Sequence, residues 1–152
     1  MKRDEFINLD KLIAFQQSED PSLIYKDLNE NKEWTCAQNK VLSNRKISYR
    51  WRRNGSLNGA PFLAFSIDEI LFMPIENHSS VIFYFTPNKK TYNLIIEEAK
   101  KNMVTSSEKT VNGELAFDFT DSNVAIQAGF AKDHFTILIM SRLDYDKGLR
   151  FN

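Results

Sequence analysis

The sequence predicts a single domain of the α+β class, residues 1–152, in which N-terminal helices precede a mainly antiparallel, twisted sheet. Three observations support this class. Apolar residues recur at helical spacing in residues 6–28. From Trp34 onward the chain changes to short runs rich in Phe, Ile, Val, Tyr and Thr, separated by turn residues. Near the C-terminus these runs are joined by turns that are too short for parallel pairing. A chain of 152 residues fits one domain with its own core.

Two helices are expected before Trp34. Asp20 followed by Pro21 is typical of an N-cap and a first helical position, and the second helix should extend to Leu28, before the polar residues 29–32. The first helix is predicted by apolar residues at helical spacing: Phe6, Leu9, Leu12, Ile13 and Phe15.

Strands are expected next. Residues 46–53 form a basic strand in which alternation places Tyr49 and Trp51 on one face and Arg50 and Arg52 on the other. Two Asn-Gly turns follow, at 54–55 and 58–59, and apolar runs at 61–66, 70–74 and 80–85 are further strand candidates.

One long helix is predicted over about 88–103, with Thr86 and Pro87 as its cap and first-turn proline. Its apolar stripe should pack on one face of the sheet: Tyr92, Ile95, Ile96, Ala99 and Met103. A C-terminal meander of four strands then follows: 106–111, 114–120, 124–130 and 135–141. Alternation within the meander predicts one dry face, which the long helix covers.

Charge is distributed unevenly, although the net charge is zero. Residues 39–53 hold six basic side chains and no acidic one. A local cationic patch suits docking to an acidic protein surface better than general binding of polyanions. The same pattern also fits a solvated outer face of a sheet. The candidate partner-binding residues are Arg45, Lys46, Arg50, Arg52 and Arg53.

No catalytic or cofactor motif is visible, so we expect neither an enzyme nor a bound cofactor or metal. Cys36 is the single cysteine, and we expect it to be a partly buried core residue. His78 and His134 fall in predicted turns without metal-ligand spacing. The densest carboxylates do not form a calcium loop, and Asp118 and Asp121 are better explained as an outward sheet residue and a turn former: Asp118, Asp121, Asp144 and Asp146.

The sequence therefore favours a protein-binding module that acts stoichiometrically. In its small size and lack of catalytic signatures, rather than in any motif, it resembles the small immunity proteins that neutralise bacterial toxins, which implies a toxin inhibitor. The cationic strand points to an acidic target surface, or to a toxin site blocked by shape. The alternative is a single-stranded RNA-binding domain that uses residues 45–53, although Tyr49 and Trp51 should face away from the arginines. An enzyme of unrecognised type is the third hypothesis.

Residues 1–15 lack the apolar core of a signal peptide, so a cytoplasmic location is expected.

Overall fold

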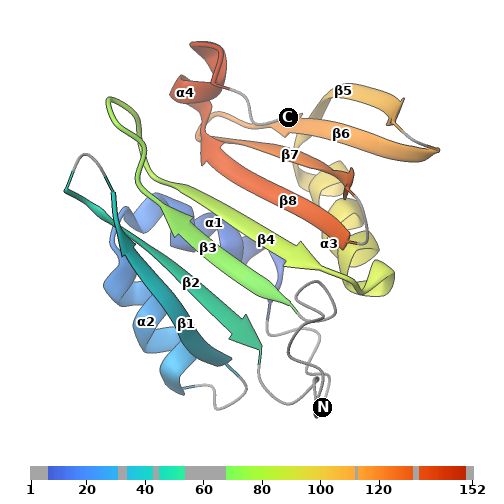
Figure 1. The fold of residues 1–152 in the computed structure, drawn as a ribbon. Helices are drawn as coiled ribbons and strands as arrows, with labels where there is room; N and C mark the ends of the chain where they lie inside the picture. The colour runs from blue at the N-terminus through green and yellow to red at the C-terminus, as the bar shows by residue number, and fades with distance from the viewer. Residues whose placement is uncertain are drawn as a thin grey trace.

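The fold was analysed in a computed structural model, which describes residues 7–30, 34–42, 45–53, 68–111, 113–131 and 134–149. Within these residues the helices and strands follow one another in two series: two helices precede the first four strands, and one helix precedes the last four and a short helix follows them (Figure 1). In chain order they are α1 (Leu9–Ser18), α2 (Pro21–Glu30), β1 (Trp34–Val41), β2 (Ile47–Arg53), β3 (Glu69–Met73), β4 (Val81–Thr86), α3 (Lys89–Asn102), β5 (Val104–Val111), β6 (Glu114–Thr120), β7 (Val124–Ala131), β8 (His134–Ser141) and α4 (Arg142–Asp146).

The eight strands of the described chain form one sheet in the order β1-β2-β3-β4-β8-β7-β6-β5. Every neighbouring pair is antiparallel. The only neighbours that are distant in sequence are β4 and β8, which meet in the middle of the sheet with Ile82 opposite Ile139. The predicted α+β class, with N-terminal helices and a C-terminal four-strand meander, is confirmed.

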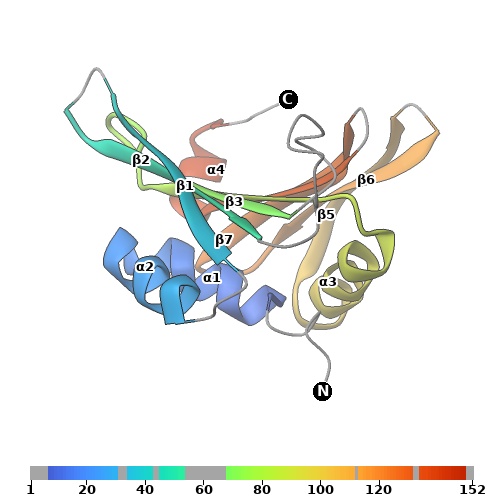
Figure 2. The same ribbon diagram turned by 60° about the horizontal axis from the view of Figure 1, so that its bottom comes forward.

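The sheet carries α1, α2 and α3 on one face and the short α4 on the other (Figure 2). We call these the helix face and the open face. The main core lies between the sheet and the three helices, and its largest fully buried side chains include Trp51, Tyr84, Phe15 and Phe119. The prediction that the long helix covers the sheet is confirmed, and the ring of Tyr92 on α3 stacks on Phe135 of β8 at 4.5 Å.

Local capping explains where the helices begin. Asn8 Oδ1 accepts a hydrogen bond from the Lys11 amide at the start of α1. Asp20 Oδ1 accepts one from the Ser22 amide at 2.9 Å, as the Asp-Pro pattern predicts for α2. The cap of α3 differs from the prediction. Asn88, rather than Thr86, accepts from the backbone of the first turn, because the helix begins only at Lys89.

The expectation of a single dry face is wrong. A second apolar cluster lies on the open face, where α4 packs over β4, β7 and β8: Val81, Ala125, Leu138 and Met140, with Tyr145 and Leu149 against them. The sequence missed α4 because five residues carry too little periodicity to predict a helix. At the edge of the sheet the dry-face pattern also fails, since Leu115 of β6 is 46% exposed.

His134 is the first residue of β8 and is buried, so its placement in a turn was wrong. The Asn-Gly turns at 54–55 and 58–59, the apolar run 61–66 and Phe6 lie outside the described residues. Gly113 lies between the end of β5 at Val111 and the start of β6 at Glu114, and it has the positive φ of 82° that a tight hairpin turn requires.

Candidate functional site

Strand β2 presents different chemistry on its two faces, as alternation predicts. Trp51 is fully buried on the helix face and Tyr49 is half-buried beside it, with the two rings stacked at 5.7 Å. Arg50 and Arg52 lie on the open face. The aromatic and cationic side chains of β2 therefore act on opposite sides of the sheet.

Arg50 and Arg52 share one acidic partner, Glu69 at the start of β3. Arg52 Nε donates to Glu69 Oε2 at 2.7 Å, and Arg50 Nη1 donates to Glu69 Oε1. Glu69 is only 3% exposed, whereas the Arg50 and Arg52 side chains are 29% and 41% exposed. A buried carboxylate is costly unless it is paired, so both arginines stabilise it. Two guanidinium groups against one carboxylate leave one formal positive charge on the open face.

The other candidate residues lie elsewhere. Arg45 and Lys46 are exposed at the end of β2 that joins β1, where Arg45 adopts a positive φ of 67°. Arg53 lies on the helix face, where its Nη2 is 3.2 Å from Asp68 Oδ2 and its guanidinium lies 5.6 Å from the centre of the Trp34 ring. The structure thus brings Arg50 and Arg52 together and separates them from Arg45, Lys46 and Arg53.

Asp68 anchors Arg53 in a buried network. Its Oδ1 accepts from Thr86 Oγ1 at 2.6 Å and its Oδ2 from the Tyr84 hydroxyl at 3.1 Å. Burial, followed by the nearby Asp68 charge, raises the pKa of Tyr84 well above its usual value, so Tyr84 remains a donor. Through these hydrogen bonds and the Arg53–Asp68 ion pair the network joins β2, β3 and β4, while the buried Arg53 Nε has no hydrogen-bond partner in the part of the chain that the structure describes.

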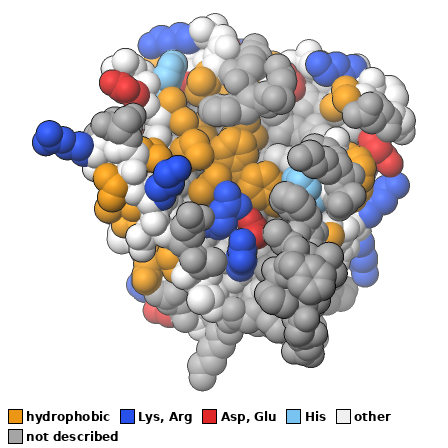
Figure 3. Space-filling view, viewed as in Figure 1, with side chains coloured by type: hydrophobic (Ala, Val, Ile, Leu, Met, Phe, Trp, Pro, Cys, Tyr) orange, Lys and Arg blue, Asp and Glu red, His pale blue; other side chains and the backbone are white. Residues whose placement is uncertain are grey.

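An apolar surface adjoins the arginines on the open face. Arg50, Leu71, Phe83 and Leu138 form one cross-strand row over β2, β3, β4 and β8. In the next row Phe85 lies opposite Glu69, and its half-buried ring stacks on Phe83 at 5.8 Å with an angle of 9° between the planes. Figure 3 shows hydrophobic side chains gathered at the centre of this face with Lys and Arg side chains beside them. We call Arg50, Arg52, Glu69, Leu71, Phe83 and Phe85 the open-face patch.

The backbone of the sheet bends toward the open face at both ends (Figure 2). In Figure 2 the β1–β2 hairpin and the β5–β6 hairpin both rise on the side away from α1, α2 and α3. The Arg50 row continues across the sheet to Gln127 and Asp118. Asp118 accepts from the Tyr145 hydroxyl of α4 at 2.7 Å, so its carboxylate is engaged within the fold. The cationic and acidic ends of the row lie on opposite sides of the apolar centre.

A third buried carboxylate, that of Asp144, fixes α4 to the open face. Asp144 Oδ1 lies 2.9 Å from His78 Nδ1, and its Oδ2 accepts from the Ser79 amide at 2.8 Å. Burial acts to raise the pKa of Asp144, but the hydrogen bonds from His78, Ser79 and Ser141 outweigh it and hold the pKa below the usual value. His78 therefore has a structural partner, although the sequence showed none.

The remaining candidate residues have ordinary surroundings. Cys36 is half-buried and packs against the main core, as predicted. Asp121 Oδ1 accepts from the amides of Asn123 and Val124, as expected for a turn former. Asp146 pairs with Arg142 at 3.0 Å. His134 is buried, and its ring meets the Phe85 ring at 5.4 Å.

Among the residues that the structure describes, no three His, Cys, Asp or Glu side chains come together as metal ligands. No helix in this part of the chain is long and apolar enough to span a membrane.

Comparison with known proteins identifies no relative. No protein-family model matches the chain, and neither the curated proteins nor the solved structures include a significant match. Function must therefore be argued from the surfaces of this molecule.

Sequence reasoning missed four members of the open-face patch: Glu69, Leu71, Phe83 and Phe85. Glu69 follows Asp68 directly before the apolar run 70–73, and this acidic pair next to a buried strand was a signal that cationic partners lie on a neighbouring strand. Phe83 and Phe85 alternate with Ile82 and Tyr84, so both faces of β4 are apolar. A strand of this kind gives no sign of which face meets the helices.

Proposed function

We propose that this protein binds another protein stoichiometrically through the open face of the sheet, as a small inhibitor of the toxin-immunity kind does. The observation that carries the proposal is the open-face patch, in which half-buried phenylalanines and Leu71 adjoin two partly exposed arginines. Protein interfaces combine an apolar, aromatic centre with a polar rim, and arginine is enriched in them.

The charge of the patch supports an acidic partner. Glu69 already neutralises one of the two arginines, so one positive charge remains for a carboxylate of the partner. Arg45 and Lys46 add two exposed cationic side chains at the far end of β2. A partner that presents carboxylates around an apolar contact would complement both the centre and the rim.

Single-stranded RNA is the second candidate, and the stacked Phe83 and Phe85 rings favour it. Trp51 is fully buried against the helices, so its ring offers bases no platform, and Tyr49 lies on the face of β2 opposite the arginines. Phe83 and Phe85 instead share the open face with Arg50 and Arg52. Aromatic rings on a sheet that stack bases, next to arginines that contact phosphates, are a known mode of RNA recognition.

A charge-free variant tests the protein-binding proposal. Arg50→Gln, Arg52→Gln and Glu69→Gln together remove the charges of the patch without leaving a buried carboxylate unpaired. The wild-type chain, this triple variant and a control, Lys109→Gln on exposed β5, are used to capture partners from host extracts. The captured protein is then purified and titrated against each chain. We expect binding that saturates near one equivalent for wild type and control, and at least about tenfold weaker binding for the triple variant, equivalent to about 1.4 kcal/mol.

The same three chains decide between protein and RNA. A fluorescent single-stranded oligoribonucleotide is titrated at two salt concentrations, because phosphate contacts make binding depend strongly on salt. Saturable RNA binding that the triple variant and a Phe85→Ala variant lose would favour RNA and overturn the protein-binding proposal. If far less than one equivalent of this protein were enough to change the activity of its target, the protein would act by turnover, as an enzyme does.

A further inference from the structure

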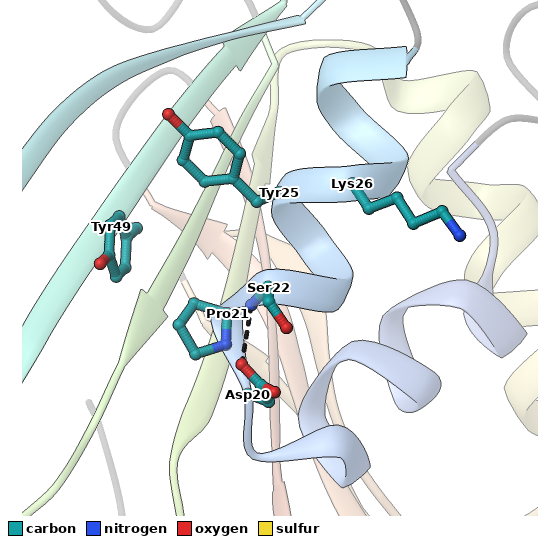
Figure 4. A pocket seen from close by; sticks show the side chains of 6 residues that line it. All are labelled: Asp20, Pro21, Ser22, Tyr25, Lys26 and Tyr49. Atoms are coloured by element: carbon teal, nitrogen blue, oxygen red, sulfur yellow. Dashed lines mark hydrogen bonds between the residues drawn. The ribbon is translucent and has the colours of Figure 1, made fainter.

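A second surface lies at the start of α2, on the helix face of β2. It is an open hollow of about 450 Å³ between α2 and β2, within the range of about 300–1,000 Å³ common for ligand sites. Its lining comes entirely from described residues: Asp20, Pro21, Ser22, Tyr25, Lys26 and Tyr49 (Figure 4). Tyr49 belongs to the face of β2 opposite Arg50 and Arg52, so the hollow is separate from the open-face patch.

Two tyrosine rings form the walls of the hollow. Tyr25 of α2 and Tyr49 of β2 meet at right angles, with an interplanar angle of 88° and 6.5 Å between ring centres. Tyr25 is 42% exposed, although its ring also packs edge-on against the buried Trp51 at 6.1 Å. Trp51 therefore holds Tyr25 and Tyr49 in place from behind, and the rings remain available to a ligand. Aromatic faces attract cations because their π systems carry a negative quadrupole.

The carboxylate at the rim has capacity for a further donor. Asp20 Oδ1 accepts the Ser22 amide at 2.9 Å, and because a carboxylate offers about four acceptor positions it can accept further donors. The hydrogen bonds from Ser22 lower the pKa of Asp20, so the group is ionised at neutral pH. Lys26 is the one cationic side chain in the lining, and Figure 4 shows it pointing away from the two tyrosines. The lining of the hollow therefore combines two tyrosine rings with one carboxylate, which Figure 4 shows beside the first turn of α2.

We propose that this hollow binds an arginine side chain of a partner protein. A guanidinium group is planar, stacks on aromatic faces and donates to carboxylate oxygens, so it uses the tyrosine walls and Asp20 together. An ammonium group is compact and strongly hydrated and cannot stack in this way. The site extends the protein-binding proposal to a second surface of different charge: the partner would present carboxylates to the open face and an arginine to this hollow.

The test uses a single amino-acid derivative and the full chain. Nα-acetyl-arginine methylamide is titrated while the aromatic proton resonances of the tyrosines are followed by NMR. The citrulline derivative is the control, because it has the same shape without the charge, and the lysine derivative tests charge without a planar group. We expect saturable shifts of Tyr25 and Tyr49 with arginine, and affinities at least about fivefold weaker for citrulline and lysine.

Variants of the lining sharpen the test. Asp20→Asn keeps a good N-cap for α2 but removes the charge. It should weaken binding of the arginine derivative severalfold and leave the affinity for the citrulline derivative unchanged. Tyr25→Leu should abolish binding, and a thermal melt checks that the fold persists. Lys26→Gln should strengthen binding. Asp10 is an exposed residue of α1, so Asp10→Asn is the matched control for a lost carboxylate and should leave arginine binding unchanged.

Three results would overturn the assignment. Equal binding of citrulline and arginine would make the hollow an apolar surface, and equal binding of lysine would make it a general cation site. Absence of saturable shifts in a folded protein would mean that no site exists. The derivative does not probe the open-face patch, and its affinity should be the same in the triple glutamine variant. Failure here would therefore leave the proposed function to its own test.

Discussion

Two neighbouring arginines of β2 have opposite roles, although they are consecutive in the sequence and pair with consecutive acidic residues. Arg52 meets Glu69 on the open face and is 41% exposed, whereas Arg53 meets Asp68 on the helix face and is 19% exposed. Asp68 has further donors from Tyr84 and Thr86, while Glu69 has only the two arginines among its described contacts. The difference teaches that the face of the strand decides whether an ion pair supports the fold or contributes to a surface.

The largest effect should come from the helix face of β2. Trp51→Ala removes a fully buried ring that stacks on Tyr49, and should destabilise the protein by about 3–5 kcal/mol, as large aromatic truncations in cores do. Chemical denaturation measures the change. A cost below about 1 kcal/mol, or a stable variant that loses only RNA binding, would contradict the assignment of this face to the core.

Asp68→Asn should have the next largest effect. The substitution leaves the largely buried Arg53 without its carboxylate partner, and it weakens the hydrogen bonds that Tyr84 and Thr86 donate to Asp68. We therefore expect the free energy of unfolding to fall by about 3 kcal/mol. The same denaturation experiment applies. Asp118→Asn, on the open face, is the matched control and should cost less than half as much, because Asp118 is only half-buried.

Glu69→Gln should cost less, about 1–2 kcal/mol, since Arg50 and Arg52 retain partial access to water. Adding Arg50→Gln and Arg52→Gln should restore most of the loss, because replacing all members of an ion-paired group costs less than removing one. A triple variant that is less stable than Glu69→Gln alone would show that the arginines contribute mainly by packing.

The smallest effect should be the contribution of Asp144, at the α4 end of the open face, to the pH dependence of the free energy of unfolding. The folded-state pKa of Asp144 is lowered from 3.8, so its stabilising contribution is fully present above that value and is lost as pH falls through the folded-state pKa. The wild-type protein should therefore be more stable than Asp144→Asn at neutral pH, and this difference in the free energy of unfolding should disappear in strongly acidic solution. Denaturation of both chains between pH 7 and pH 2.5 measures this. A constant difference across the series would mean that Asp144 titrates alike in folded and unfolded chains.

The elements of this fold were largely predictable because their signals are local. Helical spacing located α1 and α3, the Asp20-Pro21 pair located α2, and short turns located the C-terminal meander. The same local reasoning placed Trp51 in the core and Arg50 on the opposite face of β2. It failed for α4, which is too short to carry a period, and for His134, which belongs to β8 because pairing with β7 extends to Ala131.

The sequence by itself determined which side chains share a face within one strand, because alternation at a period of two depends on nothing outside the strand. Only the tertiary structure decided which strands are neighbours and in what register. The pairing of β2 with β3 brought Glu69 to Arg52, and the pairing of β3 with β4 brought Phe85 to Glu69. Packing of α2 against β2 likewise joined Tyr25 to Tyr49. These contacts join residues distant in the chain, and they depend on the burial of the whole sheet rather than on any local pattern.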